Sequence, residues 1–107
     1  MYLSDFVFFD DESTSAISEA FSLNQNTETM SLQISGESVP AITVQGIVDI
    51  EASEWMPLAI LDQSDFDLLA TISEPGIFNI SVSGVKKIRL VCDGPVGGFK
   101  AYGLFSE

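Results

Sequence analysis

The feature that most restricts the fold is a two-residue alternation of apolar and polar side chains in short runs. In residues 30–35, methionine, leucine and isoleucine alternate with serine and glutamine. The same alternation recurs in residues 42–50, 78–82 and 88–92. A period of two puts one side of an extended strand into a core, whereas an amphipathic helix needs a period near 3.6 residues. The chain is therefore predicted to consist of β-strands.

Turn residues separate these runs at intervals of roughly ten residues. Glu74-Pro75-Gly76 predicts a turn, because proline presets one backbone dihedral and glycine accepts a positive one. Residues 14–23 are interpreted as a strand, with a helix as the alternative. The eight or nine predicted strands lie at residues 5–9, 17–23, 30–34, 42–50, 58–61, 68–72, 78–82, 88–92 and 99–105.

So many short antiparallel strands in a chain of 107 residues cannot form one open sheet without exposing an apolar face. We therefore predict an all-β fold, a two-sheet antiparallel β-sandwich of jelly-roll or immunoglobulin type. The length fits a single domain over residues 1–107, with 1–29 as N-terminal strands and 30–107 as the core of the sandwich. Gly46, within a strand, indicates a bulge or a close approach of another segment.

Residues 77–92 are predicted to form a β-hairpin. Its two strands must turn their apolar faces to the same side, which requires an odd number of loop residues. A three-residue loop would pair Ile80 with Ile88, and a five-residue loop would pair Val82 with Ile88. We favour the longer loop, because the shorter one would put the β-branched Val85 into a left-handed conformation.

The charge of the chain is strongly negative. Sixteen acidic and four basic residues, with no histidine, give a net charge of −12, and no lysine or arginine precedes Lys86. Such a chain does not neutralise phosphates, so we expect no binding to nucleic acid and none to an anionic membrane. The hydrophobic content of 46% is too high for a disordered acidic segment. The acidic surface either keeps copies apart in solution or, with the basic strip of Lys86, Lys87 and Arg89, selects a docking partner.

Cysteine usage and the N-terminus point to a reducing compartment. The single cysteine, Cys92, permits no internal disulfide and alternates with Ile88 and Leu90 as a core residue would. No apolar run approaches the ~20 residues that span a bilayer. The first residues lack the positive flank of a signal peptide. We expect a protein made in the cytosol and kept or assembled there.

No catalytic machinery stands out. Without histidine, triads of the Ser-His-Asp and Cys-His kinds are excluded, and no feature marks two carboxylates as a buried hydrolytic pair. The acids at 10–12 and 62–67 do not follow the spacing of a calcium-binding loop. The glycines at 93–98 precede a predicted strand and not a helix, so we interpret them as a hairpin loop and not as a phosphate cradle. We expect no enzymatic activity, cofactor or metal site.

The aromatic residues supply the candidate contacts. Trp55 either stacks on a sugar or packs across an end of the sandwich. Phe6, Phe8 and Phe9, with Tyr2, are more than one strand face can bury, so they are covered either within the sandwich or by a neighbouring chain. The candidate interface or ligand-contact residues are Tyr2, Phe6, Phe8, Trp55, Lys86, Lys87, Arg89 and Tyr102.

Five segments carry a resemblance to a known class of proteins. They are LQISG at 32–36, ITVQG at 42–46, WMPL at 55–58, GIFNISVSG at 76–84 and KIRL at 87–90. Together they resemble small virion structural proteins of tailed bacteriophages, over roughly residues 30–92, while residues 1–29 carry no match. The resemblance implies a non-enzymatic virion component, either a capsid decoration protein or a tail or baseplate accessory. It identifies no functional residues, because these proteins act through surfaces.

Three classes of function follow from these observations. We favour a capsid decoration protein, assembled in the host cytoplasm and located in the virion. Its partners would be further copies of itself, as in a trimer, and a larger virion protein such as the major capsid protein. The alternative is a carbohydrate- or receptor-binding module of a tail or baseplate, with Trp55 and Tyr2 or Tyr102 contacting a glycan. A third class is an intracellular regulatory or immunity protein that imitates nucleic acid by its charge.

Overall fold

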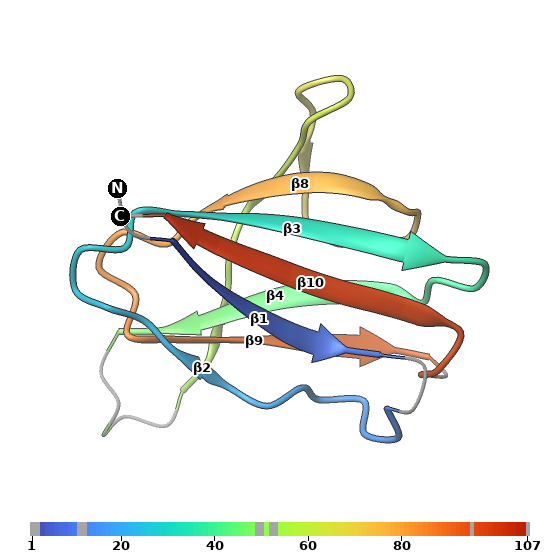
Figure 1. The fold of residues 1–107 in the computed structure, drawn as a ribbon, viewed down its shortest axis with the longest axis horizontal. Coiled ribbons are helices and arrows are strands. Elements are labelled where there is room, and N and C mark those ends of the chain that lie inside the picture. The colour runs from blue at the N-terminus through green and yellow to red at the C-terminus, as the bar shows by residue number, and fades with distance from the viewer. Residues whose placement is uncertain (1–2, 11–12, 49–50, 52–53, 95, 107) are drawn as a thin grey trace.

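The computed structural model describes residues 3–10, 13–48, 51, 54–94 and 96–106. These residues form two antiparallel sheets packed face to face, with ten strands and no helix, which confirms the predicted β-sandwich (Figure 1). The strands are β1 (Leu3–Phe9), β2 (Phe21–Ser22), β3 (Thr29–Gly36), β4 (Ala41–Ile47), β5 (Met56–Pro57), β6 (Ile60–Asp62), β7 (Leu68–Leu69), β8 (Gly76–Ser81), β9 (Lys87–Asp93) and β10 (Phe99–Ser106).

The order of the strands identifies the type of sandwich. The six-stranded sheet has the order β1-β10-β3-β8-β6-β7, and the four-stranded sheet has the order β2-β9-β4-β5. The pairing is nested, because β1 pairs with β10, β2 with β9 and β3 with β8. This is the arrangement of a jelly roll, in which an early strand returns beside a late one, with the β6–β7 hairpin added at one edge. Of the two predicted types, the jelly roll is the one present.

The alternation in the sequence becomes the inner and outer faces of the sheets. Along β3, Met30, Leu32 and Ile34 are buried, and the intervening polar residues are exposed. The same alternation places Ile88, Leu90 and Cys92 inside along β9. The two sheets thus enclose one continuous apolar core, which is the main source of stability in a domain of this size.

A register shift in β1 explains the run of phenylalanines near the N-terminus. Val7 lies opposite Tyr102, whereas Phe9 lies opposite Ala101, so the ladder is irregular between Val7 and Phe9. This irregularity allows the consecutive residues Phe8 and Phe9 to be buried together, at 6% and 2% exposed. The sandwich itself therefore covers both rings.

The N-terminal strands complete both sheets. The ring of Phe6 in β1 lies 5.0 Å from the ring of Phe21 in β2, which in turn stacks on Phe105 of β10 at 4.4 Å between centroids. Aromatic pairs at these separations stabilise beyond the area they bury. The described residues of the segment 1–29, which carries no sequence match, are therefore part of the same sandwich, and the contact of Phe6 with Phe21 links its two layers along one side.

The predicted hairpin over residues 77–92 is wrong. Ile80 in β8 pairs with Met30 in the six-stranded sheet, whereas Ile88 in β9 pairs with Gly46 in the four-stranded sheet. The chain therefore crosses between the sheets after Ser81. In such an arch the two strands lie in different sheets, and each turns its apolar face toward the core. The requirement for an odd number of loop residues therefore applies to an arch as well as to a hairpin, and it cannot distinguish the two arrangements.

Residues 14–23 contain no helix, but the predicted strand is present only in part, as β2 and a bridge between Ile17 and Val91. The side chain of Ser18 accepts a hydrogen bond from the backbone N–H of Leu90 at 2.9 Å and so attaches this segment to β9. In the part of the chain that the structure describes, no helix is long and apolar enough to cross a membrane.

Candidate functional site

The most prominent surface feature is the β6–β7 hairpin, which projects from the edge of the six-stranded sheet (Figure 1). Its loop is held by hydrogen bonds of its own. The carboxylate of Asp62 accepts bonds from the backbone N–H and the hydroxyl of Ser64, at 2.9 and 2.8 Å. The carboxylate of Asp65 accepts one from the N–H of Asp67 at 3.0 Å. These local bonds give the loop a fixed shape.

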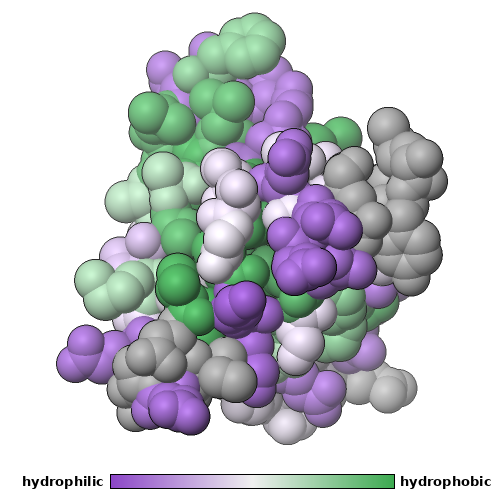
Figure 2. Space-filling model, turned by 90° about the vertical axis from the view of Figure 1, so that its left-hand side faces the viewer, coloured by the Kyte–Doolittle hydropathy of each residue, from purple (hydrophilic) through white to green (hydrophobic). Residues whose placement is uncertain are grey.

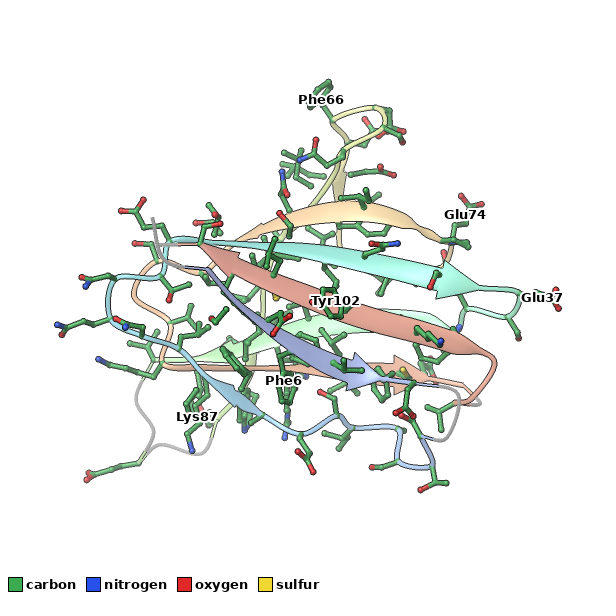
Figure 3. All side chains as sticks on the ribbon, in the orientation of Figure 1. Phe6, Glu37, Phe66, Glu74, Lys87 and Tyr102 are labelled. Carbon is green, nitrogen blue, oxygen red and sulfur yellow. The ribbon has the colours of Figure 1, made fainter. Side chains whose placement is uncertain are left out.

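The tip of this hairpin presents an aromatic ring to solvent. Phe66 is 73% exposed and has a φ of 62°, the left-handed region that bulky residues rarely adopt. Figure 3 shows its ring at the far end of the hairpin, away from both sheets. Nearby Leu68 is 74% exposed. Figure 2 shows apolar side chains gathered at this end of the molecule, with hydrophilic ones beside them. Exposed apolar groups held in a costly conformation are typical of contact sites.

The hairpin is also acidic. Asp62, Asp65 and Asp67 surround Phe66 in the sequence, and no lysine or arginine lies between positions 1 and 85. A groove of about 530 Å³ lies beside the hairpin and includes Glu74 in its lining. Among the described residues, no three acidic or cysteine side chains are grouped so that they could hold a metal ion. The groove is thus a surface of negative charge.

The basic strip lies on the outer face of the four-stranded sheet. Lys87 and Arg89 alternate along β9 with the buried Ile88 and Leu90, so they face outward. The guanidinium of Arg89 lies 4.3 Å from the centre of the Trp55 ring, and its Nε donates a hydrogen bond to Gln45 at 2.9 Å. This contact is a cation–π interaction. Because Arg89 covers one face of the half-buried indole, only the other face remains for a sugar.

A small apolar hollow adjoins the basic strip. We call it the socket; its volume is about 260 Å³. Its lining consists of Gly46, Ile47, Val48, Glu54, Met56, Leu58 and Val85. Ile47 pairs with Lys87 across the sheet, and its carbonyl oxygen accepts a hydrogen bond from the backbone N–H of Lys86 at 2.8 Å, so the backbones of both lysines lie next to a lining residue of the socket.

The absence of a side chain at Gly46 allows Leu58 and Val85 to pack closely against the backbone of β4 at the socket. A Cβ at this position would lie 3.0 Å from Cδ1 of Leu58 and 3.0 Å from Cγ1 of Val85. The pairing of Gly46 with Ile88 in β9 and with Met56 in β5 shows no register shift. Of the two readings of this glycine, the close approach of other segments is therefore the one present, and the bulge is not.

The remaining candidate residues are Phe6, Phe8, Tyr2 and Tyr102. Phe8 is in the core and Phe6 is half-buried against it, so the interior of the fold accounts for both without a partner. Tyr2 lies outside the described residues. Tyr102, 40% exposed on the outer face of β10, donates a hydrogen bond to the carboxylate of Asp5. This bond, together with partial desolvation and the negative charge of Asp5, raises the pKa of Tyr102 above its usual value.

Cys92 is a core residue. Its side chain is 5% exposed, and burial raises the pKa of its thiol from 9.0 to about 11. The reactive thiolate is therefore almost absent near neutral pH, which fits the small apolar role predicted for this residue. Among the described residues, no buried side-chain nitrogen or oxygen lacks a hydrogen-bond partner.

Sequence reasoning did not find Phe66 or the socket. Residues 62–67 lie between the predicted strands 58–61 and 68–72, and three aspartates in such a connection are typical of a solvated loop. The one available signal was a phenylalanine between Asp65 and Asp67, where no apolar alternation requires it. The socket gave no signal at all, because its lining comes from three separate stretches of the chain, 46–48, 54–58 and Val85.

The chain is a jelly-roll β-sandwich, and its most prominent surface features are the projecting hairpin, the basic strip and the socket. The sequence matches no protein-family model and no curated protein. Two solved structures share the fold. The SPBc2 prophage-derived protein YomS is similar over 97% of this chain and 92% of its own, with a TM-score of 0.84 and 18% identity. The PBSX exported protein XepA is similar over 97% of this chain and 37% of its own, with a TM-score of 0.85 and 17% identity. Both neighbours are phage-derived proteins, and at this identity the likeness shows a common fold.

Proposed function

We propose that the chain is a non-enzymatic structural protein of a phage particle, and that it acts as a capsid decoration protein. The observation that carries the proposal is the agreement with YomS, a prophage-derived protein, over nearly the full length of both chains. A whole phage-derived protein can therefore consist of this one sandwich. The phage resemblance of the segments between residues 30 and 92 supports the same origin independently.

The physical properties suit a protein that works by adhesion. A charge of −12 keeps free copies soluble before assembly. A decoration protein binds the assembled shell and not its separated subunits, so by mass action it stabilises the shell. The hairpin, the basic strip and the socket are the surfaces through which it would contact other copies of itself and a larger virion protein such as the major capsid protein.

The comparison with XepA concerns whether a protein with this fold belongs to the phage particle. The chain spans about 37% of XepA, which therefore contains further parts beside the common sandwich. XepA is described as exported, and an exported phage protein need not belong to a particle. The proposal for this chain is therefore tested by its location.

The decisive experiment compares particles from phage that carry the gene with particles from which it has been deleted. We expect mass spectrometry to find the chain in purified particles in a fixed ratio to the major capsid protein, and electron microscopy to show density on the shell. Deleted particles should release DNA at a lower temperature. Absence of the chain from purified particles, or its recovery only in the particle-free medium, would overturn the proposal.

A further inference from the structure

The projecting hairpin carries an exposed aromatic ring between two acids, and the socket is an apolar hollow in the neighbourhood of two lysines. We propose that the hairpin of one copy inserts Phe66 into the socket of a second copy, so that copies of this chain associate head to tail. The proposal goes beyond the virion role and does not rest on it, because the contact can be observed with purified protein alone.

The hairpin has the properties of a preformed plug. Its ring is among the most exposed apolar groups of the described chain, and the bonds around Asp62 and Asp65 fix the loop that carries it. A contact residue that is held in place before binding loses little conformational freedom on binding. Burial of Phe66 would also remove from water an aromatic side chain that is 73% exposed.

The socket has room for that ring. A cavity of about 150 Å³ is known to hold a benzene molecule, and the socket measures about 260 Å³. At its rim, Met56 and Val48 are 61% and 65% exposed, although both are apolar. The flexible, polarizable side chain of methionine adapts well to an inserted aromatic ring. The rim therefore offers apolar surface that a second molecule can cover.

The charges around the two surfaces are opposite. The plug carries Asp65 and Asp67 on either side of Phe66, both exposed. Lys86 and Lys87 neighbour the lining residue Ile47 in the sheet, and the lining itself contains one acid, Glu54. Complementary charges of this kind select the partner and its orientation. They also favour this partner over a lipid bilayer, whose anionic surface would repel the aspartates.

The two surfaces lie at opposite ends of one molecule. In Figure 3, Phe66 is at the top and Lys87 is near the bottom, on different sheets. A hairpin therefore reaches the socket of another copy and not its own. Such a contact is heterologous, because each copy contributes two different surfaces, and it leads to closed rings or to open chains.

The test uses two variants that each disable one surface. Phe66→Ser removes the aromatic ring of the plug and leaves the socket intact. The double substitution Lys86→Glu and Lys87→Glu reverses the charge beside the socket and leaves the plug intact. Sedimentation equilibrium of the full chain should show self-association that either variant weakens by about 30-fold or more. A mixture of the two variants should form a one-to-one dimer, since together they restore a single contact.

Matched controls separate the surfaces from general effects. Val7→Ser removes an apolar side chain that is 52% exposed on β1, and Lys100→Glu reverses a charge on β10; both should associate as the unaltered chain does. Circular dichroism checks the fold of each variant. Should Phe66→Ser unfold, Phe66→Gly replaces it, because glycine accepts the φ of 62°.

Four results would overturn the proposal. The first is an unaltered chain that stays monomeric at all concentrations. The second is a Phe66 variant that associates like the unaltered chain, and the third is a mixture of the two variants that stays monomeric. The last is a monomer whose Phe66 instead mediates binding to phosphatidylcholine vesicles. None of these outcomes decides whether the chain is present in particles, so the two proposals fail separately.

Discussion

Substitution of Gly36 by alanine should destabilise the fold strongly, and more than the same substitution at Gly84. Gly36 ends β3 and has a φ of +133°, which residues with a side chain rarely adopt. A Cβ there would lie 2.5 Å from the carbonyl oxygen of Gly98 and 2.6 Å from the Cα of Phe99. Both are backbone atoms at the start of β10, so no side-chain rotation can relieve the contact.

The expected loss has two parts. Holding alanine at such a φ costs about 1–3 kcal/mol, and forcing a group into a filled space costs about 1–3 kcal/mol more. The sum of about 2–6 kcal/mol is a large share of the ~5–15 kcal/mol that stabilises an ordinary domain. Gly84 provides the matched control, because its φ of +82° is also positive but no heavy atom lies within 4 Å of an added Cβ. Gly84→Ala should cost only the dihedral part, about 1–2 kcal/mol.

Urea denaturation measures both variants, with circular dichroism and the fluorescence of Trp55 as probes. We expect Gly36→Ala to lower the free energy of unfolding by about 1–3 kcal/mol more than Gly84→Ala, which is the steric part, through a lower midpoint at an unchanged slope. Equal losses for the two variants would refute the reasoning, since they would show that the β3–β10 junction accommodates a methyl group without cost.

The remaining predictions concern single side chains. Phe105→Ala removes a ring that is 1% exposed and stacks on Phe21, so the same titration should show a loss of about 3–5 kcal/mol. Cys92 should react with a thiol reagent only after unfolding. Its pKa rises from 9.0 to about 11 on folding, so the thiol of the unfolded chain ionises first as the pH is raised. The free energy of unfolding should therefore fall as the pH rises from 9 to about 11, and Cys92→Ala should reduce that fall. Asp5→Ala should lower the pKa of Tyr102 in a spectrophotometric titration, because it removes the acceptor and the negative charge.

The sequence predicted the strands well wherever burial alone decides the side chains. The alternation of β3 and β9 survives intact in the structure, because each of these strands has one face in the core. The prediction was less accurate for 17–23, where only Phe21 and Ser22 form a regular strand. There the chain runs along the edge of the four-stranded sheet and is held by single bonds such as that of Ser18, which leave no period in the sequence.

Pairing between strands was beyond the reach of the pattern. A period of two states which residues are buried and does not state on which sheet they lie, so the arch after Ser81 was mistaken for a hairpin. The candidate site was found in part. The basic strip is visible in the sequence because Lys86, Lys87 and Arg89 are adjacent, whereas the socket beside it exists only once β4, β5 and the arch have come together. Phe66 was missed because an exposed phenylalanine follows no rule of burial.

The nested pairing of the strands has a consequence for synthesis on the ribosome. β10 lies inside the six-stranded sheet, between the edge strand β1 and β3, although it is the last of the ten described strands to be translated. Until it emerges, β1 has no neighbour to pair with and the phenylalanines of the first strand stay uncovered. The apolar N-terminal segment of the nascent chain must therefore stay unfolded for almost the whole of translation. Because residues 1–85 contain acidic but no basic residues, neighbouring nascent chains repel one another during this period, and the repulsion protects them from aggregation.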